Sequence, residues 1–235
     1  MIGTYQNLEN LPDQVLPVAV PTSAANLHPR NRHALRRTPA APYVVMRSPR
    51  RLRRPTKCLT ARQVQGLFDA AAHAKFIGAP LNRHVIISLR DAPGRAQDAL
   101  GCILERVSKW GRYRGLQMAW LWTLEYGHRH GVHVHLLMHT RRGSRTALLG
   151  ELRKLVRGVL RAKRLENTTI RFKRVGRLGT KVDKGVLHYV CKNCSPIAAR
   201  RFAIDPSPHA AILGKRCGTS ENIGPSARRS SSNGS

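Results

Sequence analysis

Two histidines separated by one apolar residue, His133 and His135, are the residues of this sequence with the clearest capacity for chemistry. Alternate residues of a β-strand point to the same side of a sheet, so a strand here would bring both imidazoles together while Val134 faces the core. Imidazole nitrogens are common metal ligands. The pair therefore predicts part of a metal site. The alternative is a coincidence on a surface strand, in a chain with 11 histidines.

The segment before these histidines supplies a carboxylate for the same site. If residues 127–131 form a five-residue hairpin loop, Glu125 lies opposite His133, with Cβ atoms about 5 Å apart. Two imidazoles and one carboxylate suit Mn²⁺ or Mg²⁺ and leave coordination positions open for substrate oxygens. The sequence therefore predicts a divalent metal site formed by Glu125, His133 and His135.

A candidate nucleophile follows later in the chain. Tyr189 and Lys192 are three residues apart and share one face of a helix expected over 184–194. A tyrosine can attack a phosphodiester, but a free phenol has a pKa of about 10 and needs a nearby cation and a metal-polarised phosphate to react at neutral pH. A tyrosine beside a lysine on a helix more often reflects simple packing and solvation, so this pair gains weight only from its combination with the metal site.

Alternating strands and helices would position these residues. Strands are expected over 84–89, 118–126, 132–140 and 168–175, and helices over 61–75, 95–111, 144–162 and 184–194. After the first helix the order is β-α-β-β-α-β and then a helix. This order predicts an α+β, ferredoxin-like fold, with an antiparallel sheet covered by helices on one face and open to a site on the other. Trp120 and Trp122 would pack under the helices, with base stacking as the alternative.

Charge and composition indicate a polyanionic partner and divide the chain into three parts. Lys and Arg number 42 against 12 Asp and Glu, a formal net charge of +30, which favours nucleic acid. We expect a basic, largely disordered arm over 1–57, a folded domain over 58–205, and a C-terminal loop and flexible tail over 206–235. No apolar run is long enough for a membrane span, and no secretory signal is evident. Five cysteines without framework spacing indicate a reduced, cytosolic protein.

The motifs and their order resemble the HUH superfamily of single-strand DNA endonucleases. More narrowly, they resemble the rolling-circle replication initiators of plasmids and single-stranded DNA phages. HVIISLRD (84–91) resembles the first family motif, GVHVHLLMH (131–139) the second and LHYVCKN (187–193) the third. The resemblance covers about 82–195 and implies the fold described above, as an HUH endonuclease domain.

The resemblance also implies roles for individual residues. His133 and His135 would hold the metal with Glu125 as third ligand, Tyr189 would be the nucleophile, and Lys192 would support it. The implied enzyme is a nickase and ligase that cuts single-stranded DNA at a replication origin, forms a 5′-phosphotyrosyl intermediate and later rejoins the strands. A transposase of the same superfamily would use the same chemistry, so it remains an alternative.

Two departures from the family bear on the partners. Some phage relatives carry two tyrosines one helical turn apart, but here the position four residues before Tyr189 is Gly185, so only one nucleophilic tyrosine is visible in the motif. A second subunit of a homodimer or a water molecule would then have to complete termination. The chain contains no Walker A motif, so a separate helicase is expected alongside the polymerase.

Cations near the tyrosine predict a path for DNA, with a solvated basic strand as the alternative. They are Arg171, Lys173, Arg174, Arg177, Lys181 and Lys184. The rival interpretation of the whole chain is a non-catalytic basic nucleic-acid-binding protein, because a ferredoxin-like sheet suits that role equally well. Cys191 and Cys194 are expected to be plain reduced thiols, with a structural zinc site as the alternative. The segment 214–224 has the composition of a loop, and no physical account of it follows from the sequence.

Overall fold

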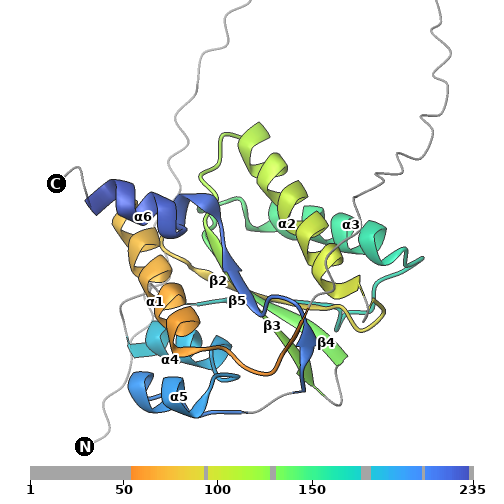
Figure 1. The fold of residues 1–235 in the computed structure, drawn as a ribbon. Coiled ribbons are helices and arrows are strands. Elements are labelled where there is room, and N and C mark those ends of the chain that lie inside the picture. Colours follow the sequence, from red (N-terminus) through yellow and green to blue (C-terminus); the bar gives the residue numbers. More distant parts are fainter. Residues whose placement is uncertain (1–53, 93–94, 128–130, 176–180, 208–209, 233–235) are drawn as a thin grey trace, which may run out of the picture. The chain divides into compact units, whose positions relative to one another are not determined.

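The computed structural model describes residues 54–92, 95–127, 131–175, 181–207 and 210–232, all within one unit of the chain, Pro49–Ser235 (Figure 1). Its strands are β1 (Pro55–Thr56), β2 (Arg83–Ser88), β3 (Trp120–Gly127), β4 (Gly131–Met138), β5 (Ile170–Arg174), β6 (Ile212–Leu213) and β7 (Cys217–Thr219). Its helices are α1 (Ala61–Phe76), α2 (Ala96–Tyr113), α3 (Arg145–Leu160), α4 (Lys181–Val190), α5 (Pro196–Phe202), the 3₁₀ helix η2 (Glu221–Ile223) and α6 (Pro225–Ser232). The α+β class predicted from the sequence is confirmed.

A five-stranded antiparallel sheet forms the centre of the described unit. Its strand order is β5-β2-β4-β3-β7, and every neighbouring pair is antiparallel. The first four of these strands, with α2 and α3, give the predicted order β-α-β-β-α-β. The β3–β4 hairpin has the predicted register, with Glu125 opposite His133 and Gly127 opposite Gly131. This register places the three expected metal ligands on one face of the sheet.

Both faces of the sheet are covered, which corrects the prediction that one face is open. On one face, α2 and α3 pack against Val85, Val134 and other side chains of the central strands. On the other face, α1, α4 and α5 enclose Leu121 and Leu137. Figure 1 shows the two helix groups on opposite sides of the sheet. The expected site therefore lies between the sheet and α4 rather than on an exposed surface.

Local sequence signals account for several of these elements. Thr60 and Gln63 form a capping box that begins α1, and each side chain bonds to the backbone of the other residue. In α2 the apolar face predicted from the periodicity is buried at Leu100, Ile103 and Val107. Trp120 and Trp122 pack, partly buried, against the cluster under α2 and α3, as predicted. The last predicted helix ends earlier than 194, at Val190.

Described residues 210–232 form strands and helices where a loop and flexible tail were expected over 206–235. β6 pairs with β1, β7 adds an edge strand beside β3, and α6 follows. Two side chains fasten this edge, because Ser220 Oγ accepts a hydrogen bond from the Trp120 backbone N–H and Asn222 donates to the carbonyl of Met118. The segment 214–224 thus closes one edge of the sheet. Its distant pairing partners explain why local composition misidentified it.

The expected N-terminal arm lies outside the described residues except for 54–57, of which Pro55 and Thr56 form β1. Among the described helices, none combines the length and the apolar character that crossing a bilayer requires.

Candidate metal centre

Glu125, His133 and His135 converge on one point between the sheet and α4. His133 Nε2 lies 3.4 Å from Glu125 Oε2, and His135 Nε2 lies 3.2 Å from the same oxygen. The three candidate ligand atoms all lie within 4.8 Å of one another. Glu125 and His135 are each 1 % exposed, whereas His133 is partly exposed at the rim. The three residues predicted from strand register are therefore brought together, with access from the His133 side.

The remaining ring nitrogens of the two histidines are occupied by other groups. His133 Nδ1 lies 3.1 Å from the carbonyl oxygen of Gly131, and His135 Nδ1 lies 3.0 Å from His84 Nε2. A carbonyl oxygen can only accept, so His133 Nδ1 carries a proton, and Nε2 is the nitrogen that faces Glu125 and could bind a metal. Such outer partners fix the ring orientation and the tautomer of metal-binding histidines.

Electrostatics keep Glu125 and His135 in the protonation states that a metal requires. Burial opposes ionisation of Glu125, but hydrogen bonds from His133 and His135 and the charge of Lys192 hold the pKa of this carboxyl well below its usual range. Burial lowers the pKa of His135. Burial also lowers the pKa of His84 to about 3, and neighbouring positive groups act in the same direction. At neutral pH Glu125 is thus a carboxylate and the rings of His84 and His135 are neutral, and a carboxylate and a neutral imidazole are the forms that bind a cation.

The donor set fits a divalent ion. For metal–ligand distances of about 2.1 Å, neighbouring ligand atoms around a tetrahedral or octahedral ion lie about 3.0–3.4 Å apart. The measured separations from Glu125 Oε2, 3.4 and 3.2 Å, fall in that range. A metal held by two nitrogens and one oxygen would keep further positions for a substrate. The residues present therefore fit the predicted cofactor class.

Tyr189 and Lys192, the other two predicted site residues, lie against this cluster. The Tyr189 ring meets the His135 ring edge-on at a centroid distance of 5.4 Å and the His84 ring at 6.1 Å. Its side chain is 48 % exposed, so solvent and a ligand have access to it. Lys192 Nζ lies 3.9 Å from the centroid of the Tyr189 ring and 3.0 Å from Glu125 Oε2. The lysine thus connects the tyrosine with the carboxylate.

The position of Lys192 differs from the prediction in one respect. It follows α4 instead of lying on it, because the helix ends at Val190. Thr123 on β3 donates a hydrogen bond from Oγ1 to the carbonyl oxygen of Val190 at 2.8 Å, which fastens the helix end directly beside the cluster. The turn after this anchor brings the lysine ammonium onto Glu125.

The predicted DNA-guiding cations do not form one surface. Arg171 and Lys173 are exposed on β5, and Lys173 pairs in register with His84, next to the cluster. Arg174 points to the opposite face by strand alternation and lines a separate pocket. Arg177 and the side chains of Lys181 and Lys184 lie outside the described residues.

His84 is a site residue that the sequence analysis did not single out. It is 5 % exposed, and it contacts both the ligand His135 and the Tyr189 ring. The only sequence signal for a role of His84 was its place as the first residue of HVIISLRD (84–91), the segment that resembles the first family motif. Strand pairing across a separation of 51 residues was needed to show that its side chain reaches the site.

Other candidate ligands lie apart from the centre. His139 bonds through Nδ1 to the carbonyl oxygen of Pro80 at 2.9 Å. Cys191 and Cys194 are free thiols, and within the described part of the chain neither belongs to a group with metal-binding geometry. Comparison of the chain with protein-family models, with curated proteins and with solved structures found no match in any of the three.

Proposed function

We propose that this protein is a metal-dependent endonuclease and strand transferase that nicks single-stranded DNA and initiates rolling-circle replication. The observation that carries the proposal is the contact of Tyr189 with the candidate metal centre, because the ring lies edge-on to the ligand His135 at 5.4 Å. A tyrosine, a lysine and a two-histidine, one-carboxylate cluster in mutual contact match the chemistry of phosphodiester transfer to a phenol.

The sheet supports the same proposal. The order β5-β2-β4-β3 is the order that a ferredoxin-like β-α-β-β-α-β unit produces. In the HUH domain that the motifs resemble, the histidines lie on central strands and the tyrosine on an adjacent helix. Here β4 carries both histidines at the centre of the sheet, and α4 carries the tyrosine.

The side chains have distinct roles in the proposed reaction. A bound Mn²⁺ or Mg²⁺ would supply Lewis-acid polarisation of the scissile phosphate. Tyr189 loses its proton to solvent, and its Oη forms a bond to phosphorus while the bond from phosphorus to the 3′ oxygen breaks. The leaving 3′ oxygen takes up a proton from solvent, and the 5′ phosphate stays on the tyrosine. Lys192, 3.9 Å from the ring centroid, stabilises the developing phenolate.

The reverse transfer would rejoin strands without ATP, since the phosphotyrosine conserves the phosphodiester bond energy. Single-stranded DNA at a replication origin, in the bacterial cytoplasm, is the proposed substrate, and a separate helicase and polymerase are the proposed partners. With one visible tyrosine, a homodimer would provide the second nucleophile. A transposase that uses the same site differs in its DNA sequence and not in its chemistry.

A denaturing-gel assay tests the proposal. The protein is incubated with labelled single-stranded DNA from its own replicon and Mn²⁺, beside Tyr189→Phe and His133→Ala. We expect a covalent protein–DNA band that both substitutions and EDTA abolish. Tyr113→Phe is the matched control, because Tyr113 is 92 % exposed at the end of α2.

Two outcomes of this assay count against the proposal. Cleavage that survives Tyr189→Phe would identify another nucleophile. Binding without cleavage on every origin-spanning fragment would favour the rival function, a non-catalytic basic nucleic-acid-binding protein, to which the net charge of +30 is equally suited.

A further inference from the structure

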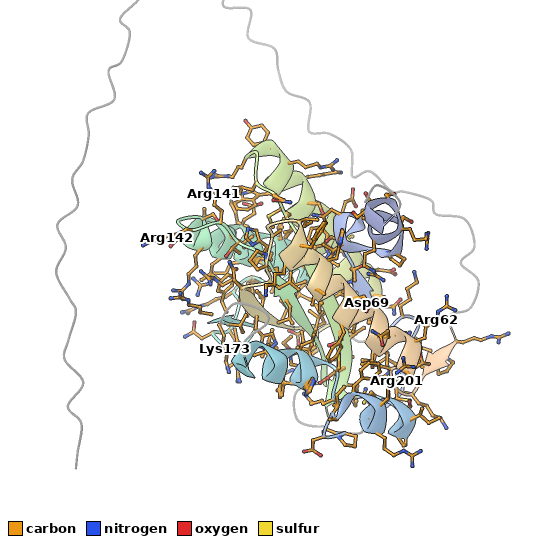
Figure 2. All side chains as sticks on the ribbon, turned by 90° about the vertical axis from the view of Figure 1, so that its left-hand side faces the viewer. Arg62, Asp69, Arg141, Arg142, Lys173 and Arg201 are labelled. Atoms are coloured by element: carbon orange, nitrogen blue, oxygen red, sulfur yellow. The ribbon has the colours of Figure 1, made fainter. Side chains whose placement is uncertain are left out.

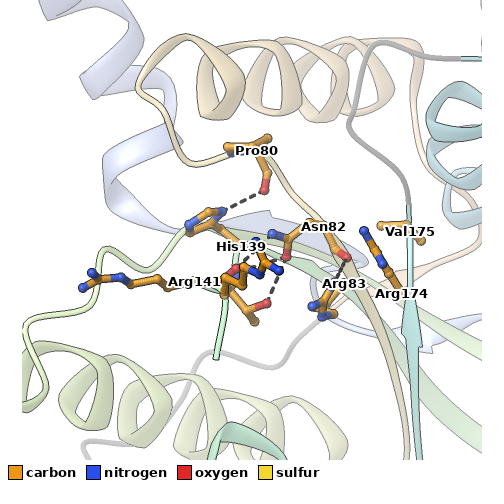
Figure 3. A pocket seen from close by; sticks show the side chains of 9 residues that line it. Pro80, Asn82, Arg83, His139, Arg141, Arg174 and Val175 are labelled. Carbon is orange, nitrogen blue, oxygen red and sulfur yellow. Dashed lines mark hydrogen bonds between the residues drawn. The ribbon is translucent and has the colours of Figure 1, made fainter. Parts of the chain in front are cut away.

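A pocket at the end of the sheet carries an unusual concentration of arginines. It has a volume of about 610 Å³ and lies where β2 begins and where β4 and β5 end (Figure 3). Nine described residues line it: Pro80, Asn82, Arg83, His139, Thr140, Arg141, Arg142, Arg174 and Val175. Four of these are arginines and none is acidic.

The positive charge in this pocket is not neutralised by the described part of the protein. None of the four arginines forms an ion pair with a described residue. Arg83 and Arg174 are register partners on neighbouring strands, so their side chains leave the same face of the sheet. Burial first, and then the charges of Arg174 and Arg145, lower the pKa of Arg83, and an anion beside the guanidinium would offset these effects. Nε of Arg83 is buried without a hydrogen-bond partner.

The pocket wall is held rigidly in place. Asn82 bonds through its side chain to the backbone N–H, hydroxyl and carbonyl groups of Thr140, at distances of 2.9–3.0 Å. This connection fixes the segment that bears Arg141 and Arg142 against the start of β2. Arg141 and Arg142, which are both exposed, lie on the same side of the view in Figure 2 as Lys173. A fixed wall with exposed guanidinium groups suits bidentate recognition of phosphate oxygens.

The pocket and the candidate metal centre are connected by two strands. On β2, Arg83 directly precedes His84, which contacts the metal ligand His135. Along β4, His139 of the pocket lies four residues beyond His135, or about 13 Å at about 3.3 Å per residue. Lys173, the register partner of His84, lies on the adjacent strand. One extended strand of nucleic acid is long enough to reach both places.

We propose that this arginine pocket binds backbone phosphates of the single-stranded DNA, a few nucleotides from the phosphate held at the metal centre. The inference rests on the proposed function for its ligand, and it adds a second anchor that fixes the direction of the strand across the sheet. The phosphodiester is favoured over a small anion because three of the four arginines in the pocket are exposed and the chain is strongly basic.

Fluorescence anisotropy with a labelled oligodeoxythymidine, in EDTA and in a Tyr189→Phe background, tests binding apart from catalysis. The pocket variant is Arg141→Ala/Arg174→Ala. The matched control is Arg62→Ala/Arg201→Ala, which removes the same charge from exposed positions on α1 and α5, on the opposite side of Figure 2. We expect the pocket variant to bind roughly tenfold more weakly, and the slope of log K against log salt to fall by about 0.7 for each phosphate that the variant no longer binds. The control variant should keep the salt slope of the parent protein, and its affinity for the oligonucleotide should stay within about twofold of the parent value.

Two results would overturn the inference. Equal decreases of affinity in both double variants would mean that only total charge matters. Loss of thermal stabilisation by inorganic pyrophosphate in the pocket variant, with unchanged DNA binding, would identify a site for a small anion instead. The proposed function is tested separately by the gel assay. The covalent band can be missing while the pocket variant still binds DNA more weakly, and the band can be present while the pocket variant binds DNA normally.

Discussion

His84 and His135 face each other through their ring nitrogens, with 3.0 Å between His84 Nε2 and His135 Nδ1. Only one of the two nitrogens can carry the proton in this contact. With an ion bound at Glu125, His135 would donate from Nδ1 to His84 and bind the ion through Nε2. A histidine outside the ligand set thereby selects the metal-binding tautomer of a ligand. This arrangement leads to the first of four predictions.

His84→Phe should weaken Mn²⁺ binding by about 10–100-fold, because outer partners of metal-binding histidines contribute about that much to affinity. The aromatic shape is retained while the nitrogen that accepts from His135 is removed. Isothermal titration with Mn²⁺ measures the change. His73→Phe on α1, where the ring stacks on Phe76 away from the site, is the control and should bind as the wild type does. Unchanged affinity in His84→Phe would show that His135 needs no such partner.

Lys192→Met should separate metal binding from catalysis. The ammonium lies 3.0 Å from the Glu125 oxygen that a cation would also use, so its removal relieves repulsion and Mn²⁺ should bind at least as tightly. Strand nicking should nevertheless fall by about 100-fold or more, because the charge that we propose to stabilise the phenolate is gone. Single-turnover assays and Mn²⁺ titration measure the two effects.

The surface pair Lys109–Glu105 provides the control for this experiment. Both side chains are more than half exposed, with 2.7 Å between the charged atoms. Lys109→Met should therefore alter neither the affinity for Mn²⁺ nor the rate of strand nicking. Loss of Mn²⁺ binding in Lys192→Met would contradict the assigned role and would point to a structural one.

Gly218→Ala should destabilise the protein by about 1–3 kcal/mol, the usual cost of overpacking. Gly218 on β7 is the register partner of Trp122, and an added Cβ would lie 2.8 Å from the indole Nε1. Gly101→Ala on α2 is the matched control, since an added Cβ meets nothing within 4 Å there and alanine favours a helix by about 1 kcal/mol. The midpoint of urea unfolding should therefore fall in Gly218→Ala and rise in Gly101→Ala. Equal shifts of the midpoint in the two variants would mean that β7 tolerates the methyl group.

The cysteines should differ sharply in reactivity. Burial raises the pKa of Cys217 to about 11 and also raises the pKa of Cys191. At about pH 8, roughly one Cys217 thiol in a thousand is ionised, so alkylation in the native state should be slow. Cys102 is exposed on α2 and should react first with iodoacetamide, as peptide mass spectrometry would show. Rapid native-state modification of Cys191 would contradict this order.

The candidate metal cluster was predictable because a hairpin is a local structure. The strand period of two places His133 and His135 on one face, and a short loop fixes Glu125 opposite His133. Element order was likewise readable from apolar periodicity in α2 and α3. These features depend on neighbouring residues, so the sequence alone determined them.

Long-range pairing decided the rest. The contact of His84 with His135 requires β2 to lie beside β4, and the arginine pocket requires β2, β4 and β5 to end together. The edge strand β7 depends on a partner, β3, about a hundred residues earlier in the chain. Residues 214–224 therefore resembled a loop. Such contacts form only when the hydrophobic core brings distant segments together, and no local pattern records which segments will meet.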